Sequence, residues 1–296
     1  SPTGFDYVDG KYINIDPIAA LFNDAWFTQA LHMSLAAFAA TGFAVAGIHA
    51  LMLINGKNKV FHWKAFRIAI VYGGIAALLQ PISGDISAKD IAIRQPAKLA
   101  AMEAHFETSK SAPLLIGGIP DVEKKEVNYG IKIPGALSFL AHGDFEKEVI
   151  GLDQFPEDEQ PPVMITHFAF QIMVGLGMIM MALSILYFFS TWKKKYWQEK
   201  RWFLWLFVLA TPIGFMAVEA GWTVTELGRQ PWIIYGFMKT KDALTPIPGI
   251  QISFMIFTAV YVSLSAIVSF LLYRQIKSLP NMEGEQPAEN QSSTQH

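Results

Sequence analysis

The sequence predicts an all-α integral membrane protein with about five transmembrane helices. Its 296 residues are 52% hydrophobic and only 16% charged, whereas a soluble domain usually carries about 25% charged residues. The hydrophobic residues gather in charge-free intervals, and a helix of about 20 apolar residues crosses a bilayer core. These intervals are residues 25–56, 68–84, 160–192, 202–218 and 243–273.

Two short basic segments between the intervals indicate the orientation. Residues 57–67 hold four Lys and Arg and no acid, and residues 193–201 hold five against a single Glu. Short loops rich in Lys and Arg stay in the cytoplasm. The chain therefore divides into an extracytoplasmic segment at 1–24, two transmembrane helices within 25–84, a long extracytoplasmic loop at 85–160, three transmembrane helices within 161–273 with an outer loop at 219–242, and a polar cytoplasmic tail at 274–296 that we expect to be disordered.

The loop at residues 85–160 is longer than a simple connection requires. Residues 98–107 are rich in good helix formers and predict a short amphipathic helix at the membrane surface. The Gly-Gly-Ile-Pro-Asp stretch at 117–121 predicts a turn. Long structured loops are often functional, so we expect binding residues in this one.

The composition excludes several kinds of site. Without cysteine, the chain holds no disulfide, iron–sulfur cluster or covalently attached c-type haem. The net charge of -2 identifies no partner, and we expect no nucleic acid to bind. The first residues form no signal peptide, and the chain starts with Ser1 rather than Met, so we expect Ser1 to be an internal position of a longer chain.

Histidine and methionine within the spans are candidate haem ligands. Counted from the basic segments, His32 and Met173 both lie about 30–37 Å above the cytoplasmic side at about 1.5 Å per residue. An imidazole and a thioether at one depth can hold a haem iron from both sides. His167, also near the outer end, is a rival ligand, whereas His49 lies too close to the cytoplasmic end. The alternative is that the histidines bond to neighbouring helices and the methionine fills space.

Two further groups of polar residues lie at the expected outer face. Glu226, Arg229 and Trp222 follow the fourth interval, and the simplest alternative is an aromatic belt with an ion pair between residues three apart. In the long loop, Lys98 and Glu103 are five residues apart and do not share a helix stripe. A carboxylate there can accept a proton from a quinol, the alternative being a solvated charged face.

Four stretches of sequence resemble one known family. They are Lys-Leu-Ala-Ala-Met-Glu-Ala at 98–104, Gly-Ile-Pro-Asp at 118–121, Phe-Ala-Phe-Gln-Ile-Met at 168–173 and Glu-Ala-Gly-Trp with Gly-Arg-Gln-Pro-Trp within 219–232. In order and approximate spacing the sequence resembles subunit I of the cytochrome bd-type quinol oxidases, of the type with a short quinol loop. The resemblance covers nearly the whole chain.

The resemblance implies a role for each candidate residue. His32 and Met173 match the axial ligands of the low-spin b haem, and Lys98 and Glu103 match the quinol-interacting pair of the loop. It also implies that Glu226 is the ligand of the high-spin b haem iron, that Arg229 is a basic residue near it and that Trp222 lies between the haems.

The resemblance further implies a quinol:oxygen oxidoreductase of the bacterial cytoplasmic membrane. Quinol is oxidised at the outer face, and electrons pass through the b haems toward oxygen reduction at haem d. Family members have nine spans, and this chain corresponds to the last five. We therefore expect the haem d ligand outside this chain and no activity from the chain alone. Its expected partners are the N-terminal part of the same subunit, a second oxidase subunit and a small accessory subunit.

One residue departs from the family pattern. Gln171 stands two residues before Met173, where family members often carry Arg, so we expect a lower haem potential or a compensating group elsewhere. Two other classes remain open. One is a cofactor-free membrane transporter or structural protein. The other is a di-haem b anchor of a dehydrogenase, which needs paired histidines at two depths.

Overall fold

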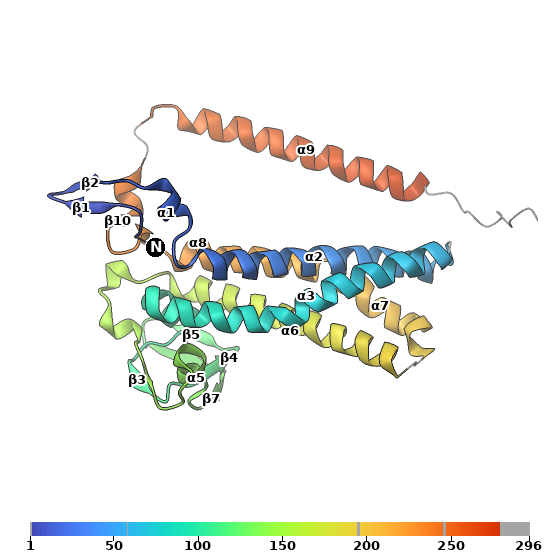
Figure 1. The fold of residues 1–296 in the computed structure, drawn as a ribbon, viewed down its shortest axis with the longest axis horizontal. Coiled ribbons are helices and arrows are strands. Elements are labelled where there is room, and N and C mark those ends of the chain that lie inside the picture. Colours follow the sequence, from blue (N-terminus) through green and yellow to red (C-terminus); the bar gives the residue numbers. More distant parts are fainter. Residues whose placement is uncertain (1, 58, 194–195, 245–246, 279–296) are drawn as a thin grey trace, which may run out of the picture.

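The computed structural model describes residues 2–57, 59–193, 196–244 and 247–278. Within these ranges, five helical segments are long and apolar enough to cross a membrane, as the sequence predicted. Four of them form a bundle and the fifth lies apart (Figure 1). The segments are α2 (Trp26–Ile54), α3 (Lys59–Arg94), α6 (Val163–Trp192), the pair α7 (Arg201–Ala210) and α8 (Ile213–Gly228), and α9 (Ile250–Ser278).

Small residues and aromatic rings hold the bundle together. A Cβ built on Gly42 of α2 would lie 2.5 Å from the Cα of Gly73 in α3, so the two backbones nearly touch where they cross. Such close crossings are typical of membrane helices. The buried ring of Phe207 in α7 lies 5.2 Å from that of Phe66 and 6.1 Å from that of Phe43, between centroids. The bundle core therefore joins α2, α3 and α7.

Several helix ends differ from the charge-free intervals, and α3 already begins at Lys59, within the basic segment 57–67. α3 runs to Arg94, so residues 85–94, which were assigned to the loop, are helical. α8 runs to Gly228, so the first ten residues of the predicted outer loop 219–242 are helical as well. Charged residues at these ends do not stop a helix, because its backbone bonds continue beyond the apolar part of the span. α9 continues to Ser278, and the rest of the predicted tail, 279–296, lies outside the described residues.

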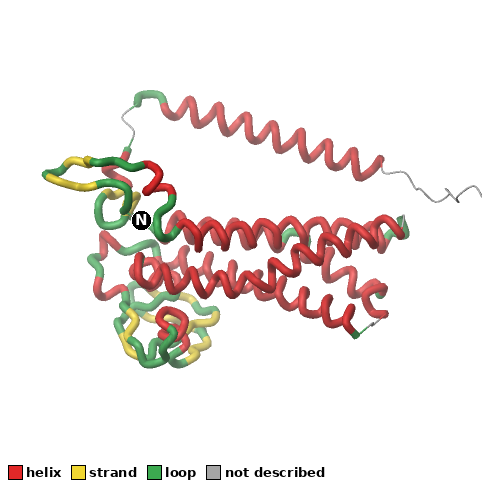
Figure 2. The backbone as a smooth tube through the Cα atoms, viewed as in Figure 1, coloured by secondary structure: helices red, strands yellow, loops and turns green. Residues whose placement is uncertain are grey.

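The long loop forms a set of nested antiparallel strand pairs at one end of the bundle (Figure 2). Gly117 and Gly118, with φ of +68° and +101°, make the predicted turn between β4 and β5. The elements of the loop are α4 (Pro96–Met102), β3 (Ser109–Lys110) paired with β8 (Glu148–Val149), β4 (Leu114–Ile116) paired with β7 (Ile131–Ile133), β5 (Ile119–Asp121) paired with β6 (Glu126–Asn128), α5 (Ala136–His142), and the 3-10 turns η1 (Leu152–Gln154) and η2 (Glu157–Glu159).

The prediction of an amphipathic surface helix at 98–107 is wrong. α4 ends at Met102, and every residue from Ala97 to Phe106 is buried. The small apolar side chains that favour a helix here also allow the strand pairs of the loop and the outer end of α6 to pack closely around it. Buried polar residues of this segment are therefore enclosed by protein.

The remaining short elements lie at the same end. Phe237, between β9 and β10, packs its ring edge-on against Phe5 and Tyr7 of the N-terminal segment, at 5.6 and 5.8 Å between centroids. These elements are β1 (Asp6–Val8), β2 (Lys11–Ile13), α1 (Pro17–Leu21), β9 (Trp232–Ile234), β10 (Met238–Lys239) and η4 (Thr240–Ala243). At the opposite end η3 (Tyr196–Glu199) joins α6 to α7.

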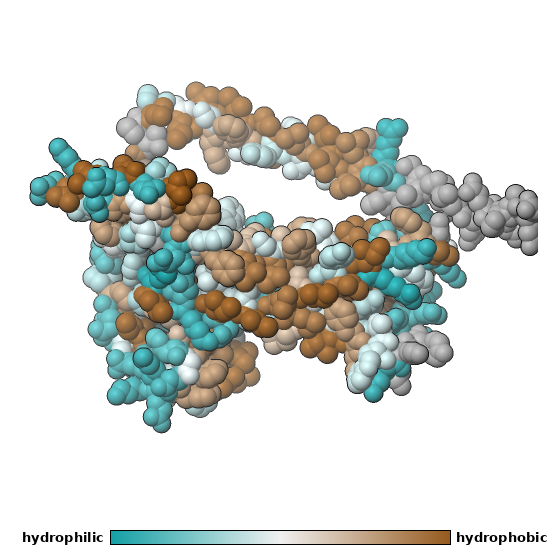
Figure 3. Space-filling view, in the orientation of Figure 1, coloured by the Kyte–Doolittle hydropathy of each residue, from teal (hydrophilic) through white to brown (hydrophobic). Residues whose placement is uncertain are grey.

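The surface divides into zones that follow this architecture. In Figure 3 hydrophobic side chains cover the middle of the bundle, and hydrophilic ones gather over the loop end and the opposite end. None of the apolar window of α9 is buried, so its large hydrophobic side chains are exposed. An apolar band between two polar ends is the surface expected of a protein in a bilayer.

Candidate functional site

Two side chains of α3 hold the ring of His32. Its Nδ1 lies 2.9 Å from the hydroxyl oxygen of Ser83, and that hydroxyl donates its own proton to the carbonyl oxygen of Gln80 at 2.9 Å. The oxygen of Ser83 therefore accepts from Nδ1–H, which leaves Nε2 without a proton. The amide of Gln80 donates to Nε2 at 3.2 Å. Histidine ligands of metals are commonly oriented in this way through their other ring nitrogen.

The thioether of Met173 rests on α8. A Cβ built on Gly221 would come within 2.9 Å of its Sδ atom, so glycine leaves room for the thioether here. Trp222, the next residue, is 62% exposed. α8 packs against both α2 and α6, the helices that carry His32 and Met173. An unprotonated imidazole nitrogen and a thioether fit the donor set of an axial haem pair.

Lys98 crosses the end of α8. A Cβ built on Gly228 would lie 3.1 Å from both Cγ and Cε of Lys98. Beside it, Nη2 of Arg229 donates to Glu226 at 2.6 Å, which is the ion pair that the sequence left open. Burial lowers the pKa of Lys98 to about 8, and the charge of Arg229 adds to this fall while Glu226 opposes it. Lys98 therefore belongs to the same cluster as Glu226 and Arg229.

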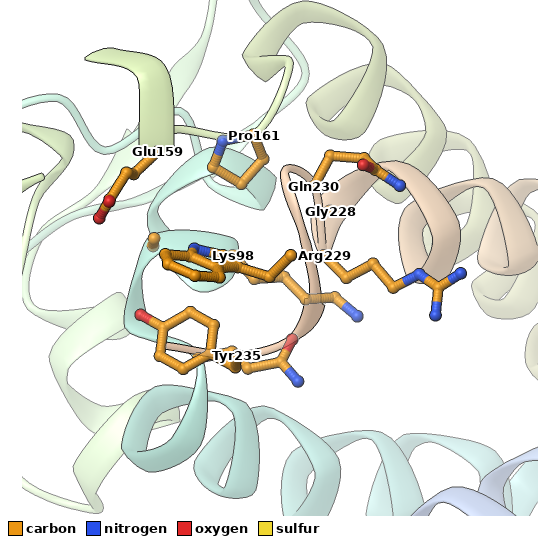
Figure 4. Close-up of a pocket in the computed structure, with 10 residues that line it drawn as sticks. Lys98, Glu159, Pro161, Gly228, Arg229, Gln230 and Tyr235 are labelled. Atoms are coloured by element: carbon orange, nitrogen blue, oxygen red, sulfur yellow. The ribbon is translucent and has the colours of Figure 1, made fainter. Parts of the chain in front are cut away.

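A narrow pocket opens beside this cluster, between the long loop and the end of α8. Figure 4 shows Lys98 and Arg229 extending to one side of it, with Glu159 and Tyr235 on the other. Lys239 closes this region by pairing with Asp158 at 2.9 Å and with Glu159 at 3.1 Å. Basic and aromatic groups therefore meet around a space of about 180 Å³, which is smaller than the about 300 Å³ or more of a typical ligand pocket.

Glu103 follows α4 directly and is only 1% exposed. Among the described residues, neither of its carboxylate oxygens makes a hydrogen bond of standard geometry. Burial raises its pKa to about 8, an effect that the nearby backbone of Leu115 partly offsets. A buried carboxyl group with a raised pKa and no partner is typical of functional sites.

The outer end of α6 makes hydrogen bonds to two loop segments near Glu103, one at Met102 and one at residues 115–117. Nδ1 of His167 lies 2.8 Å from the carbonyl oxygen of Met102, to which it donates. One turn along the helix, the amide of Gln171 donates to the carbonyl oxygen of Leu115 at 3.0 Å, and its oxygen accepts from the backbone N–H of Gly117 at 3.0 Å. α6 thus anchors the loop around the carboxyl group.

The structure separates two residues that were predicted to act as a pair, Lys98 and Glu103. Lys98 meets Glu226 and Arg229, whereas Glu103 faces the loop strands and α6. His49 lies toward the opposite end and shares a 2.8 Å hydrogen bond with His62, so it does not join the outer group. No local pattern indicates that Gln171 bonds to the loop or that Gly228 leaves room for Lys98, because each acts on a partner far away in the chain.

Comparisons with known proteins identify relatives over the whole chain. The family model described as cytochrome bd terminal oxidase subunit I matches residues 1–280. A Bacillus subtilis (strain 168) protein, provisionally named cytochrome bd menaquinol oxidase subunit I, is 40% identical over 98% of this chain and 66% of its own length. The cytochrome bd ubiquinol oxidase subunit 1 of the same organism is 30% identical over 93% of this chain and 62% of its own length.

A solved structure agrees with these sequence matches. The bd oxidase from Geobacillus thermodenitrificans superposes with a TM-score of 0.85 at 38% identity, over 95% of this chain and 64% of that chain. This chain therefore spans 62 to 66% of the length of these relatives. The similarity extends through the spans and the loop.

Proposed function

This chain belongs to the cytochrome bd terminal oxidase subunit I family, and from that membership we propose that it oxidises quinol and carries b haems as part of a terminal oxidase. Its long loop lies outside the bacterial cytoplasmic membrane and its C-terminus inside, as the basic segments at 57–67 and 193–201 favour. Oxygen is the final electron acceptor, at a haem d whose ligand is outside this chain. No comparison supports the transporter or the dehydrogenase anchor.

The family resemblance assigns the haem ligands, and the donor chemistry of His32 and Met173 supports it. His32, with Nε2 unprotonated, and Met173 would hold the iron of a low-spin b haem, and Glu226 would hold that of a high-spin b haem with Arg229 and Trp222 nearby. These haems supply one-electron oxidation and reduction when bound. The hydrogen bond from His32 to Ser83 keeps the ring in the ligating tautomer, which is this chain's own contribution.

The buried carboxyl group of Glu103 is the observation that carries the quinol assignment. Oxidation of a quinol releases two protons, and an unpaired carboxylate accepts one of them. Lys98, which is largely buried beside the pocket, binds the oxygen of the head group and draws charge toward it. The two residues face different neighbours, so one residue orients the head group and the other accepts the proton.

An optical spectrum combined with turnover tests this function. We expect reduced b-type bands from the chain assembled with its partner subunits, and oxidation of ubiquinol-1 or menadiol by the complex. Glu103→Gln should keep the bands and lose most of the turnover. A spectrum without b-type bands would exclude the haem assignment, and full turnover by Glu103→Gln would exclude the role of this carboxyl group.

A further inference from the structure

His167 has a side-chain atom that its structural role leaves unused. The residue is fully buried in the first turns of α6, and Nδ1 donates to the carbonyl oxygen of Met102. Because a carbonyl can only accept, Nδ1 carries the proton and Nε2 of the neutral ring carries none. Among the described residues, Nε2 makes no hydrogen bond. The lone pair of this nitrogen is therefore free to accept a hydrogen bond or a proton.

This nitrogen belongs to the surroundings of Glu103. Met102, which His167 holds, immediately precedes Glu103, and Leu115, which Gln171 holds one turn further along α6, has its backbone next to the carboxyl group. The apolar cluster here includes Ala101, Leu115 and Val163, so it joins α4, β4 and the start of α6. The carboxyl group of Glu103 and Nε2 of His167, both without a hydrogen-bond partner among the described residues, therefore lie where the same three segments meet.

We propose that His167 is a second proton acceptor at the quinol site, taking one quinol proton at Nε2 while Glu103 takes the other. This inference rests on the proposed function. Each quinol O–H bond breaks and leaves its electron pair on oxygen. The two protons go to the carboxylate and the imidazole, and the two electrons would leave one at a time to the b haems of the proposed function, each haem taking one. The backbone of Gly117 also lies near the ring, so the protonated ring has a second group to bond.

The protonation state of Glu103 favours a second proton acceptor at the site. Because burial raises the pKa of Glu103 to about 8, only the minority of these carboxyl groups that are ionised at pH 7 can take a quinol proton, and each takes one of the two. The other titratable groups on the packed elements are engaged elsewhere. Lys98 faces Arg229 and Glu226, and the ring of His105 bonds to the carbonyl oxygen of Val149 at 3.2 Å. His167 is thus a base on these packed elements whose Nε2 lone pair has no hydrogen-bond partner among the described residues.

The test uses His167→Asn in the assembled, haem-loaded protein. Asn keeps an N–H for the Met102 carbonyl but has no basic nitrogen, so a purely structural role survives the change. We expect ubiquinol-1 turnover to fall at least about 10-fold. We also expect ubiquinol-1 to bind about 5-fold more weakly to the fully reduced, anaerobic protein, because the shorter Asn side chain places no acceptor where Nε2 of His167 lay. Ubiquinone-1, which has no hydroxyl proton to donate, should bind as before.

Controls separate the possible failures. His105→Asn, a buried loop histidine bonded elsewhere, should leave turnover and both affinities unchanged. His167→Gln provides a second variant if the Asn protein does not assemble. Unchanged ubiquinol-1 affinity and turnover in either assembled variant would overturn the proposal, as would loss of the low-spin haem band, which would make His167 a haem ligand. If the unaltered protein binds neither probe, the proposed function itself is wrong.

Discussion

Gln171 of α6 donates a hydrogen bond from Nε2 to the carbonyl oxygen of Leu115 at 3.0 Å, across 56 residues of chain. Its amide oxygen also accepts from the backbone of Gly117. One neutral side chain therefore satisfies two backbone groups of the loop at a position where the family resemblance led us to expect a cation. Gln171 lies two residues before Met173, so its two hydrogen bonds attach the loop to the helix that carries the proposed haem ligand.

Gln171→Leu should loosen this part of the loop. Two hydrogen bonds are lost, each worth about 1 kcal/mol, so amides near Leu115 and Gly117 should exchange with deuterium roughly 30-fold faster. Gln198→Leu is the matched control, because Gln198 bonds to Ser190 at the opposite end of the bundle. Equal protection of the loop in both variants would show that other contacts hold it.

Turnover should depend on pH through Glu103. The carboxyl group accepts a proton only when ionised, so quinol oxidation should rise as pH increases through about 8. Glu103→Gln should remove this rise, and a pH profile of ubiquinol-1 oxidation measures it. If the rise persists in the variant, another group controls it.

The same carboxyl group should make stability depend on pH. Burial raises its pKa in the folded protein from 4.5 to about 8, so the stability that it contributes is fully present below pH 4.5 and is lost as pH rises through about 8. The unaltered protein should therefore lose more thermal stability between pH 7 and 9 than Glu103→Gln does. Parallel melting temperatures across this range would contradict the raised pKa.

His32→Ala should remove the low-spin b haem, because the iron loses its imidazole ligand. Met173→Leu should retain a haem with altered spin state or lower potential. Ser83→Ala removes only the bond that fixes the tautomer, and should weaken haem retention by about 10-fold or more. His49→Ala changes a histidine of the same helix far from the site and should leave the reduced spectrum intact. Unaltered spectra in His32→Ala would refute the assignment.

Gly228→Ala should displace Lys98 without removing its charge. The new Cβ would lie 3.1 Å from two carbons of the lysine stem, so the ammonium group must shift. We expect a higher KM for ubiquinol-1 with little change in kcat. Gly175→Ala, at a helix position where nothing lies within 4 Å of the new Cβ, is the control. An equal KM in both variants would remove Lys98 from head-group binding.

The spans could be predicted from the sequence because a bilayer requires long apolar helices, and that requirement is visible in composition alone. The ends of α3 and α8 could not, since backbone hydrogen bonding carries a helix past its last apolar residue. Burial of α4 was also missed. Small apolar residues favour a helix equally at a surface and in a core, and the covering strands lie elsewhere in the chain.

The sequence predicted which residues belong to the candidate site, but not which of them lie next to one another. The motifs identified Lys98 and Glu103 together, yet their different neighbours depend on where the end of α8 and the strand β4 lie. The anchoring role of Gln171 depends on a contact with Leu115 that no local pattern encodes.

α3 has 36 residues and is therefore about 54 Å long, well beyond the about 30 Å of a bilayer core. A single residue, Gln95, separates it from α4, which carries Lys98. The height of Lys98 above the lipid is therefore determined by the tilt of the membrane helix α3, because no flexible loop lies between α3 and α4. Helices adjust their tilt to bilayer thickness. The depth at which a lipid-dissolved head group meets this lysine should therefore vary with the acyl-chain length of the surrounding lipids.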